Sequence, residues 1–203
     1  AQGTATFALP KIGHYAYPGA EYTGKLDIID IGIPQAVVEA VGPKQFLLTA
    51  DRIRSYFQPR AAETHKGKTG HLLVVAGSTG KTGAGAMTAV SAMRAGAGLV
   101  TLGIPRSLHP VLETMVTEPM TVGLPETDQG ALDESAYDTV RSLIEDKRCL
   151  AIGPGIGTAA STGRLLVRLI EESPVPMVID ADGLNLIAAE PDVLSRSNAP
   201  MVL

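Results

Sequence analysis

The sequence has 203 residues, of which 45% are hydrophobic and 19% are charged, so it can form one or two folded domains. Its 22 glycines and 14 prolines are too few for a low-complexity or collagen-like chain. A formal net charge of −4, with no block of Lys and Arg, argues against a nucleic-acid partner. The longest apolar runs, such as residues 72–76, are too short to span a bilayer, which argues against a membrane protein.

The cysteine content and the first residues indicate where such a protein would work. Cys149 is the only cysteine, which excludes an internal disulfide framework and a multi-cysteine zinc site. The chain opens on Ala1-Gln2-Gly3, without the basic and apolar regions of a signal peptide. A cytoplasmic location is therefore expected.

Residues 1–45 form the first of two segments that differ in pattern. Turn residues interrupt short extended runs, which predicts strands at 5–9 and 26–31 and a short helix at 35–40. Two strands and a short helix are too little to bury a core. This segment is therefore expected to be a fragment of another domain or an arm on the second one.

Residues 46–70 are expected to connect the two segments. Thr49 is predicted to cap a helix over 50–57, because its hydroxyl can accept a hydrogen bond from a first-turn amide.

From residue 71 onward, apolar strands alternate with helices. The strands are predicted at 71–76, 99–104, 119–124, 149–153, 176–180 and from residue 200. The helices are predicted at 84–95, 106–116, 133–146, 160–172 and 182–189. This order predicts an α/β fold with a mostly parallel sheet and helices on both faces. Because the last residues read as the start of another strand, the domain is expected to be truncated at its C-terminal side.

A glycine-rich segment, GSTGKTG at 77–83, follows the first of these strands. It fails the Walker A spacing, because counting back five residues from Gly80 gives Val75 inside the strand. A glycine-rich turn that enters a helix still leaves free backbone N–H groups, which suit an anion or a close ligand. A tight turn that allows close packing explains the same residues equally well.

Two further segments lie where strands are predicted to end. Three glycines in GPGIG at 153–157 favour a ligand-binding loop over a simple turn, since ligands of open α/β sheets bind at the carboxyl ends of strands. Asp180 ends the next strand, and Asp182, which follows it, is equally well explained as the cap of the next helix. Two carboxylates there could bind a metal, accept a substrate hydroxyl or tune a neighbouring acid.

Taken together, the motifs identify a family. Six segments occur in its order: HKG at 65–67, GHLLVVAGS at 70–78, GAG at 83–85, RAGAGLV at 94–100, GPGIG at 153–157 and DADGLN at 180–185. Over about residues 49–203 the chain resembles the NAD(P)H-hydrate dehydratases, which have a ribokinase-like fold. Residues 4–34, with TFALPK at 6–11 and YPGAE at 17–21, resemble the tail of the NAD(P)H-hydrate epimerase domain.

The resemblance implies two domains and a repair reaction. Residues 1–45 would be the C-terminal tail of the epimerase domain, and residues 46–203 the N-terminal part of the dehydratase domain. The dehydratase would phosphorylate the C6 hydroxyl of (6S)-NAD(P)H hydrate and eliminate phosphate to restore NAD(P)H. It would use ADP, or ATP in the eukaryotic type, with Mg²⁺, and the enzyme would assemble as a homo-oligomer. The epimerase would interconvert the two hydrate epimers at a K⁺ site.

The resemblance also implies roles for particular residues. The family's hydrate-binding loops and its strand-end motif near the reacting centre match the following positions: Gly83, Ala84, Gly85, Gly153, Pro154, Gly155, Gly157, Asp180, Asp182 and Asn185. Lys66 is expected to approach the nucleotide phosphates as a point charge. The family's general-base Asp and the epimerase's K⁺ segment have no counterpart in the chain, so the fragment alone is expected to be inactive.

Two other functions remain compatible with the sequence. A ribokinase-like kinase of a vitamin or sugar would share the phosphoryl transfer without the elimination. A non-catalytic nucleotide-binding module would bind ADP or NADPH without turnover.

Overall fold

The computed structural model describes residues 1–57, 59 and 61–203. The chain divides into two compact units, one up to residue 60 and one from Ala61 to Leu203. Their boundary lies inside the connector predicted over 46–70.

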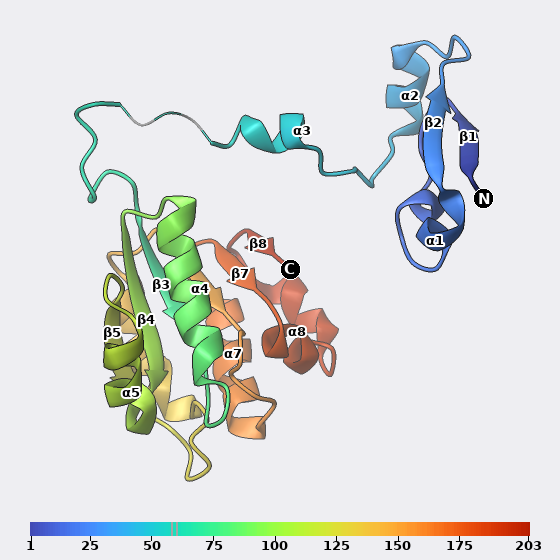
Figure 1. Cartoon of the computed structure of the whole chain (residues 1–203). Helices are drawn as coiled ribbons and strands as arrows, with labels where there is room; N and C mark the ends of the chain where they lie inside the picture. Colours follow the sequence, from blue (N-terminus) through green and yellow to red (C-terminus); the bar gives the residue numbers. More distant parts are fainter. Residues whose placement is uncertain (58, 60) are drawn as a thin grey trace. The chain divides into compact units, whose positions relative to one another are not determined.

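In its described residues, the first unit contains one parallel pair of strands and four short helical segments (Figure 1). The strands are β1 (Gly3–Phe7) and β2 (Lys25–Ile29). The helical segments are a 3-10 helix (Ile12–His14), α1 (Gly19–Thr23), α2 (Gln35–Val41) and α3 (Ala50–Arg54). Thr49 caps α3 as predicted, by accepting a hydrogen bond from the Arg52 amide, but the helix ends three residues before the predicted position 57.

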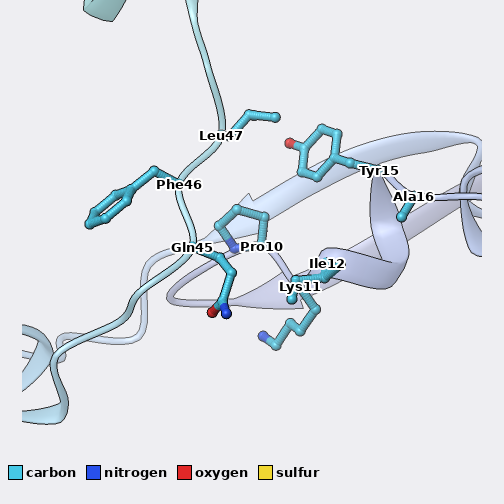
Figure 2. Close-up of a pocket in the computed structure, with 8 residues that line it drawn as sticks. All are labelled: Pro10, Lys11, Ile12, Tyr15, Ala16, Gln45, Phe46 and Leu47. Carbon is cyan, nitrogen blue, oxygen red and sulfur yellow. The ribbon is translucent and has the colours of Figure 1, made fainter. Parts of the chain in front are cut away.

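This first unit buries almost nothing. Among its described residues only Thr6 and Thr23 are buried, whereas Tyr17 and Val41 are each 79% exposed. Figure 2 shows an open apolar pocket lined by Tyr15, Leu47 and Ile12 of the 3-10 helix. The structure thus confirms that two strands and short helices do not form a core of their own.

The second unit is built on a six-stranded sheet in the order β5-β4-β3-β6-β7-β8, with every neighbouring pair parallel (Figure 1). The strands are β3 (His71–Val75), β4 (Leu99–Pro105), β5 (Met120–Leu124), β6 (Cys149–Ile152), β7 (Met177–Ile179) and β8 (Met201–Val202). The helices are α4 (Thr82–Ala95), α5 (His109–Met115), α6 (Tyr137–Ile144), α7 (Ala160–Glu172) and α8 (Asp182–Ile187). The predicted α/β fold is confirmed.

Three details of the helices differ from the prediction. The predicted helices at 106–116 and 133–146 each begin as a 3-10 turn, Arg106–Leu108 and Glu134–Ala136, before continuing as α5 and α6. A further 3-10 helix, Pro191–Arg196, was not predicted. Short 3-10 segments lack the 3.6-residue apolar period that reveals an α-helix in a sequence.

The side chains of β3 divide the core into two layers. Leu73 and Val75 pack into a cluster with α6 and α7, whereas Val74 and Ala76 pack into a cluster with α4 and α5. Successive side chains of a strand point to opposite faces, so an unbroken apolar strand requires cover on both. Helices therefore lie on both faces, as predicted.

The chain reverses its direction across the sheet between β3 and β6. After β3 it continues to β4 and β5 on one side, and after β6 it continues to β7 and β8 on the other. In open α/β sheets this reversal separates the loops at the carboxyl ends of two adjacent strands and leaves a place for a ligand.

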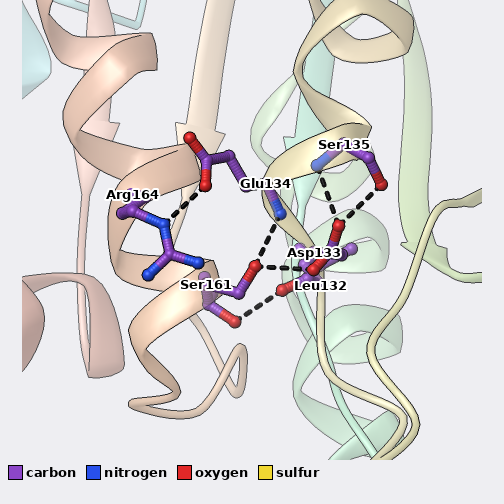
Figure 3. Close-up of polar contacts among 7 residues, drawn as sticks. Leu132, Asp133, Glu134, Ser135, Ser161 and Arg164 are labelled. Carbon is purple, nitrogen blue, oxygen red and sulfur yellow. Dashed lines mark hydrogen bonds and ion pairs between the residues drawn. The ribbon is translucent and has the colours of Figure 1, made fainter.

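A polar network joins the connection after β5 to α7 (Figure 3). Asp133 accepts hydrogen bonds from the hydroxyl of Ser135 at 2.7 Å, from its amide at 3.0 Å and from the hydroxyl of Ser161 at 2.6 Å. The Ser161 hydroxyl also accepts from the Glu134 amide, and Glu134 pairs with Arg164. These donors, led by the Ser135 and Ser161 hydroxyls, lower the pKa of Asp133 to about 2.

Within the described residues, the structure contains no helix with the length and hydrophobicity that a membrane crossing requires.

The Asp133 network predicts a pH-dependent contribution to stability. Because the folded-state pKa lies below the unfolded value, the contribution is present above about pH 4 and is lost as the pH falls toward 2. Asp133→Ala is expected to lower Tm at pH 6, and the difference from the wild type should narrow by pH 3. Thermal unfolding monitored by circular dichroism across this pH range measures the Tm of both proteins. A Tm difference that stays constant with pH would contradict the proposed contribution of the Asp133 network.

Candidate functional site

The loops after β3 and β6 meet at the reversal point. Gly77 donates its backbone N–H to the carbonyl oxygen of Pro154 at 2.8 Å. The Ser78 hydroxyl donates to the carbonyl oxygen of Gly155 at 2.7 Å, and Ser78 is buried. The two glycine-rich segments predicted as separate candidates are therefore one continuous surface.

Asp182 joins the same surface from the start of α8. Its Oδ2 accepts a hydrogen bond from the Lys81 ammonium at 2.7 Å and another from the Gly157 amide at 2.9 Å. Asn185 donates from its side-chain amide to the other oxygen, Oδ1, at 3.5 Å. The Lys81 hydrogen bond, with the Gly157 amide, holds the pKa of Asp182 below its usual value, so the carboxyl group is ionised at neutral pH. The prediction that Asp182 caps the helix is wrong, because Ala181 occupies the N-cap position and the Asp182 side chain makes no capping hydrogen bond.

Asp180 lies beside this cluster in a tight turn. Its Oδ1 accepts from the Ala181 amide at 2.7 Å, and the side chain is exposed. The Gly183 amide donates to the carbonyl oxygen of Asp180 at 2.9 Å, and Ala181 has φ 52° and ψ −120°. These angles match a type II′ turn, whose first central position normally holds glycine. Sequence reasoning missed this strained alanine, because nothing in the residue type signals it.

The glycines of the site have different roles. A Cβ on Gly153 would lie 1.9 Å from the carbonyl oxygen of Asp180. A Cβ on Gly155 would lie 2.8 Å from the Cβ of Ala84. A Cβ on Gly85 would meet the Leu102 side chain at 3.5 Å, next to the sheet. Gly83, in contrast, faces open space. Packing therefore accounts for Gly153 and Gly155, whereas a side chain at Gly85 would make only ordinary contact and Gly83 is left on the open surface at the start of α4.

The structure does not bring Lys66 to this surface. Lys66 lies before β3, and a Cβ on Gly98, just before β4, would come within 2.0 Å of its carbonyl oxygen. Both observations place it at the amino edge of the sheet, whereas the glycine loops follow the carboxyl ends. The five residues of β3 span about 16 Å, further than a lysine side chain reaches. The structure thus places Lys66 away from the glycine loops, and its approach to the nucleotide phosphates stays a prediction.

A third loop also reaches the surface. Thr79 donates its backbone N–H to the carbonyl oxygen of Gly130 at 2.9 Å, and a Cβ on Gly130 would lie 2.0 Å from the Thr79 hydroxyl. Sequence reasoning missed this contact, because Gly130 is 51 residues away and belongs to no recognised motif. The one feature of the sequence that indicates this contact is a single glycine within a long polar connection.

In the described part of the chain, no cluster of three or more His, Cys, Asp or Glu side chains could hold a metal ion by itself. Of the two predicted carboxylates, Asp182 already accepts hydrogen bonds from Lys81 and Gly157, and Asp180 accepts one from Ala181. A cation here would therefore depend on Asp180 together with oxygens of a bound ligand.

The two kinds of glycine predict opposite results on substitution. Gly153→Ala is expected to lower the free energy of unfolding by about 2 kcal/mol or more, because the new Cβ collides with backbone at positive φ. Gly83→Ala, in open space on a helix, is expected to change it by less than about 0.5 kcal/mol. Chemical denaturation of both variants measures the difference, and equal losses would contradict the assigned roles.

Comparison with solved structures identifies the fold. A ribokinase-like superfamily protein of Enterococcus faecalis matches with a TM-score of 0.59 and 21% identity, over 71% of this chain and 48% of that one. An ADP/ATP-dependent NAD(P)H-hydrate dehydratase of Bacillus subtilis, co-crystallised with ATP/Mg²⁺, matches with a TM-score of 0.52 and 24% identity, over 67% and 46%. The predicted ribokinase-like fold is confirmed.

Comparison with curated sequences identifies the relatives. A bifunctional NAD(P)H-hydrate repair enzyme of Moorella thermoacetica is 44% identical over 200 residues, which are 98% of this chain and 38% of that enzyme. One of Thermofilum pendens is 34% identical over 98% of this chain and 37% of its own length. The chain thus spans less than two fifths of these relatives.

The family model described as NAD(P)H-hydrate dehydratase matches residues 72–203. This range contains the whole sheet except its first residue, and all the loops that meet beside Asp182. The match covers more than half of the chain, and the chain belongs to the NAD(P)H-hydrate dehydratase family.

Proposed function

We propose that the full-length protein repairs nicotinamide nucleotides by ADP-dependent dehydration of (6S)-NAD(P)H hydrate. The observation that supports this most is the family match over residues 72–203, which includes the loop cluster at the sheet reversal. The relative from Moorella thermoacetica, named for the same repair, aligns with 98% of the chain.

The reaction needs a poor leaving group to become a good one. Phosphorylation of the C6 hydroxyl of the hydrate achieves this, and the elimination of phosphate then restores the dihydronicotinamide. The protein must hold the phosphate donor against that hydroxyl and exclude water. The open surface at Gly83 and the hydrogen-bonded loop at 153–157 are the parts of this chain that would hold the substrate.

Mg²⁺ would neutralise charge on the nucleotide phosphates. In proteins it is held by one or two carboxylates together with phosphate oxygens and water. Asp180 fits this requirement, because its carboxylate is exposed at the carboxyl end of β7 and accepts one hydrogen bond from Ala181. Asp182 fits less well, since its Oδ2 already accepts from Lys81 and Gly157.

We further propose that residues 1–45 are the tail of an epimerase domain that interconverts the hydrate epimers at a K⁺ site. The bifunctional relatives align across this segment, and its unburied apolar side chains fit a piece of a larger domain. A homo-oligomeric state and a cytoplasmic location belong to the same proposal. Inactivity of the 203-residue chain by itself stays a prediction.

An assay of the full-length protein tests the dehydratase activity. Purified NADPH hydrate should regain dihydronicotinamide absorbance when ADP and Mg²⁺ are added, and the 203-residue chain should give no recovery. ATP is assayed in a separate reaction to identify the phosphate donor.

The assay also separates the two other functions. Absence of recovery with either nucleotide would contradict the dehydratase, and phosphate transfer to a vitamin or sugar alcohol would identify a kinase. Binding of ADP or NADPH without any turnover would identify a nucleotide-binding module.

A further inference from the structure

The contacts that hold the 153–157 loop differ in their chemistry. Pro154 and Gly155 are held through their carbonyl oxygens by neutral donors, the Gly77 amide and the Ser78 hydroxyl. Gly157, at the other end of the loop, is held through charge. Its N–H donates to Asp182, and the same carboxylate oxygen accepts from the Lys81 ammonium.

Lys81 and Asp182 come from distant parts of the chain. They are 101 residues apart, and their Nζ and Oδ2 atoms lie 2.7 Å from each other. The backbone of Lys81 immediately precedes α4, and its carbonyl oxygen would lie 3.0 Å from a Cβ on Gly155. The main chain of Lys81 therefore lies beside the loop, and its side chain holds Asp182.

Burial is unequal within this ion pair. The Asp182 side chain is 17% exposed, whereas that of Lys81 is 49% exposed. A pair with one half-exposed partner adds little to the stability of the fold, because water competes for its charge. Its main effect is geometric, since it fixes the direction of the carboxylate that holds the Gly157 amide.

We propose that Lys81 is a positioning residue for the hydrate-binding loop. Through Asp182, its ammonium group holds the Gly157 end of the 153–157 loop in the arrangement that binds the nicotinamide nucleotide. This inference rests on the proposed dehydratase function and adds to it a residue that sequence reasoning did not select.

The physical consequence concerns substrate binding more than the chemical step. Without the ammonium group, Asp182 loses its cationic partner and can turn away from Gly157. A loosened loop weakens contacts that are made equally to the substrate and to the transition state. Such a loss raises KM and leaves kcat almost unchanged.

Steady-state kinetics of the full-length enzyme with NADPH hydrate tests this. Lys81→Met is expected to raise KM about tenfold, equivalent to about 1.4 kcal/mol, with kcat within about twofold and an unchanged Tm. Lys81→Arg, which keeps the charge, should restore most of the affinity. Lys68→Met is the matched control, because it removes the same charge from an exposed side chain at the amino edge.

A double variant distinguishes positioning from direct contact with the substrate. If Lys81 acts through Asp182, the combination Lys81→Met with Asp182→Asn should raise KM no further than the worse single variant. Additive effects would instead mean that the ammonium group touches the substrate itself, which would overturn the inference.

Three other outcomes would also overturn it. An unchanged KM in Lys81→Met, with an active wild type, refutes the inference while the dehydratase function stands. A fall in Tm and in kcat together would mean a structural role. A wild type without turnover would instead refute the proposed function, and this inference with it.

Discussion

The parallel pairing of β3 with β6 is the contact on which the second unit depends. These two strands are adjacent in the sheet but far apart in the sequence, and the chain leaves them in opposite directions. The loops that follow the two strands therefore lead away in opposite directions, and neither covers the carboxyl end of the other strand. Instead the loops meet side by side, and the amide of Gly77 and the hydroxyl of Ser78 join them. The candidate site is a result of this topology.

Close backbone approach is the second constraint on the site. Where the end of β6 passes the end of β7, the Cα of Gly153 leaves no room for a side chain beside the Asp180 carbonyl group. The same holds at Gly183, where a Cβ would lie 2.8 Å from the Ile179 side chain. Glycines that resemble a binding signature in the sequence thus serve the packing that brings Asp180 and Asp182 beside the loops.

Most of the fold follows from the sequence, because buried strands and amphipathic helices have clear periods. The six strands of the sheet lie within about two residues of their predicted positions. The site was harder to predict, since it depends on which edge of the sheet each residue occupies. Lys66, for example, lies at the amino edge and away from the glycine loops, as its position before a strand already indicated. The Lys81–Asp182 and Thr79–Gly130 contacts depend on strand order, which local patterns do not contain.

The alanine at position 181 gives the turn between the two carboxylates an unusual property. Glycine in a type II′ turn can exchange among several backbone states, whereas alanine has fewer, and at φ 52° and ψ −120° Ala181 lies outside the left-handed region that L-residues favour. The turn therefore gives up some stability and gains a single well-defined shape. Asp180 and Asp182 leave the backbone in fixed directions before any ligand arrives, so binding would cost little ordering entropy at this turn.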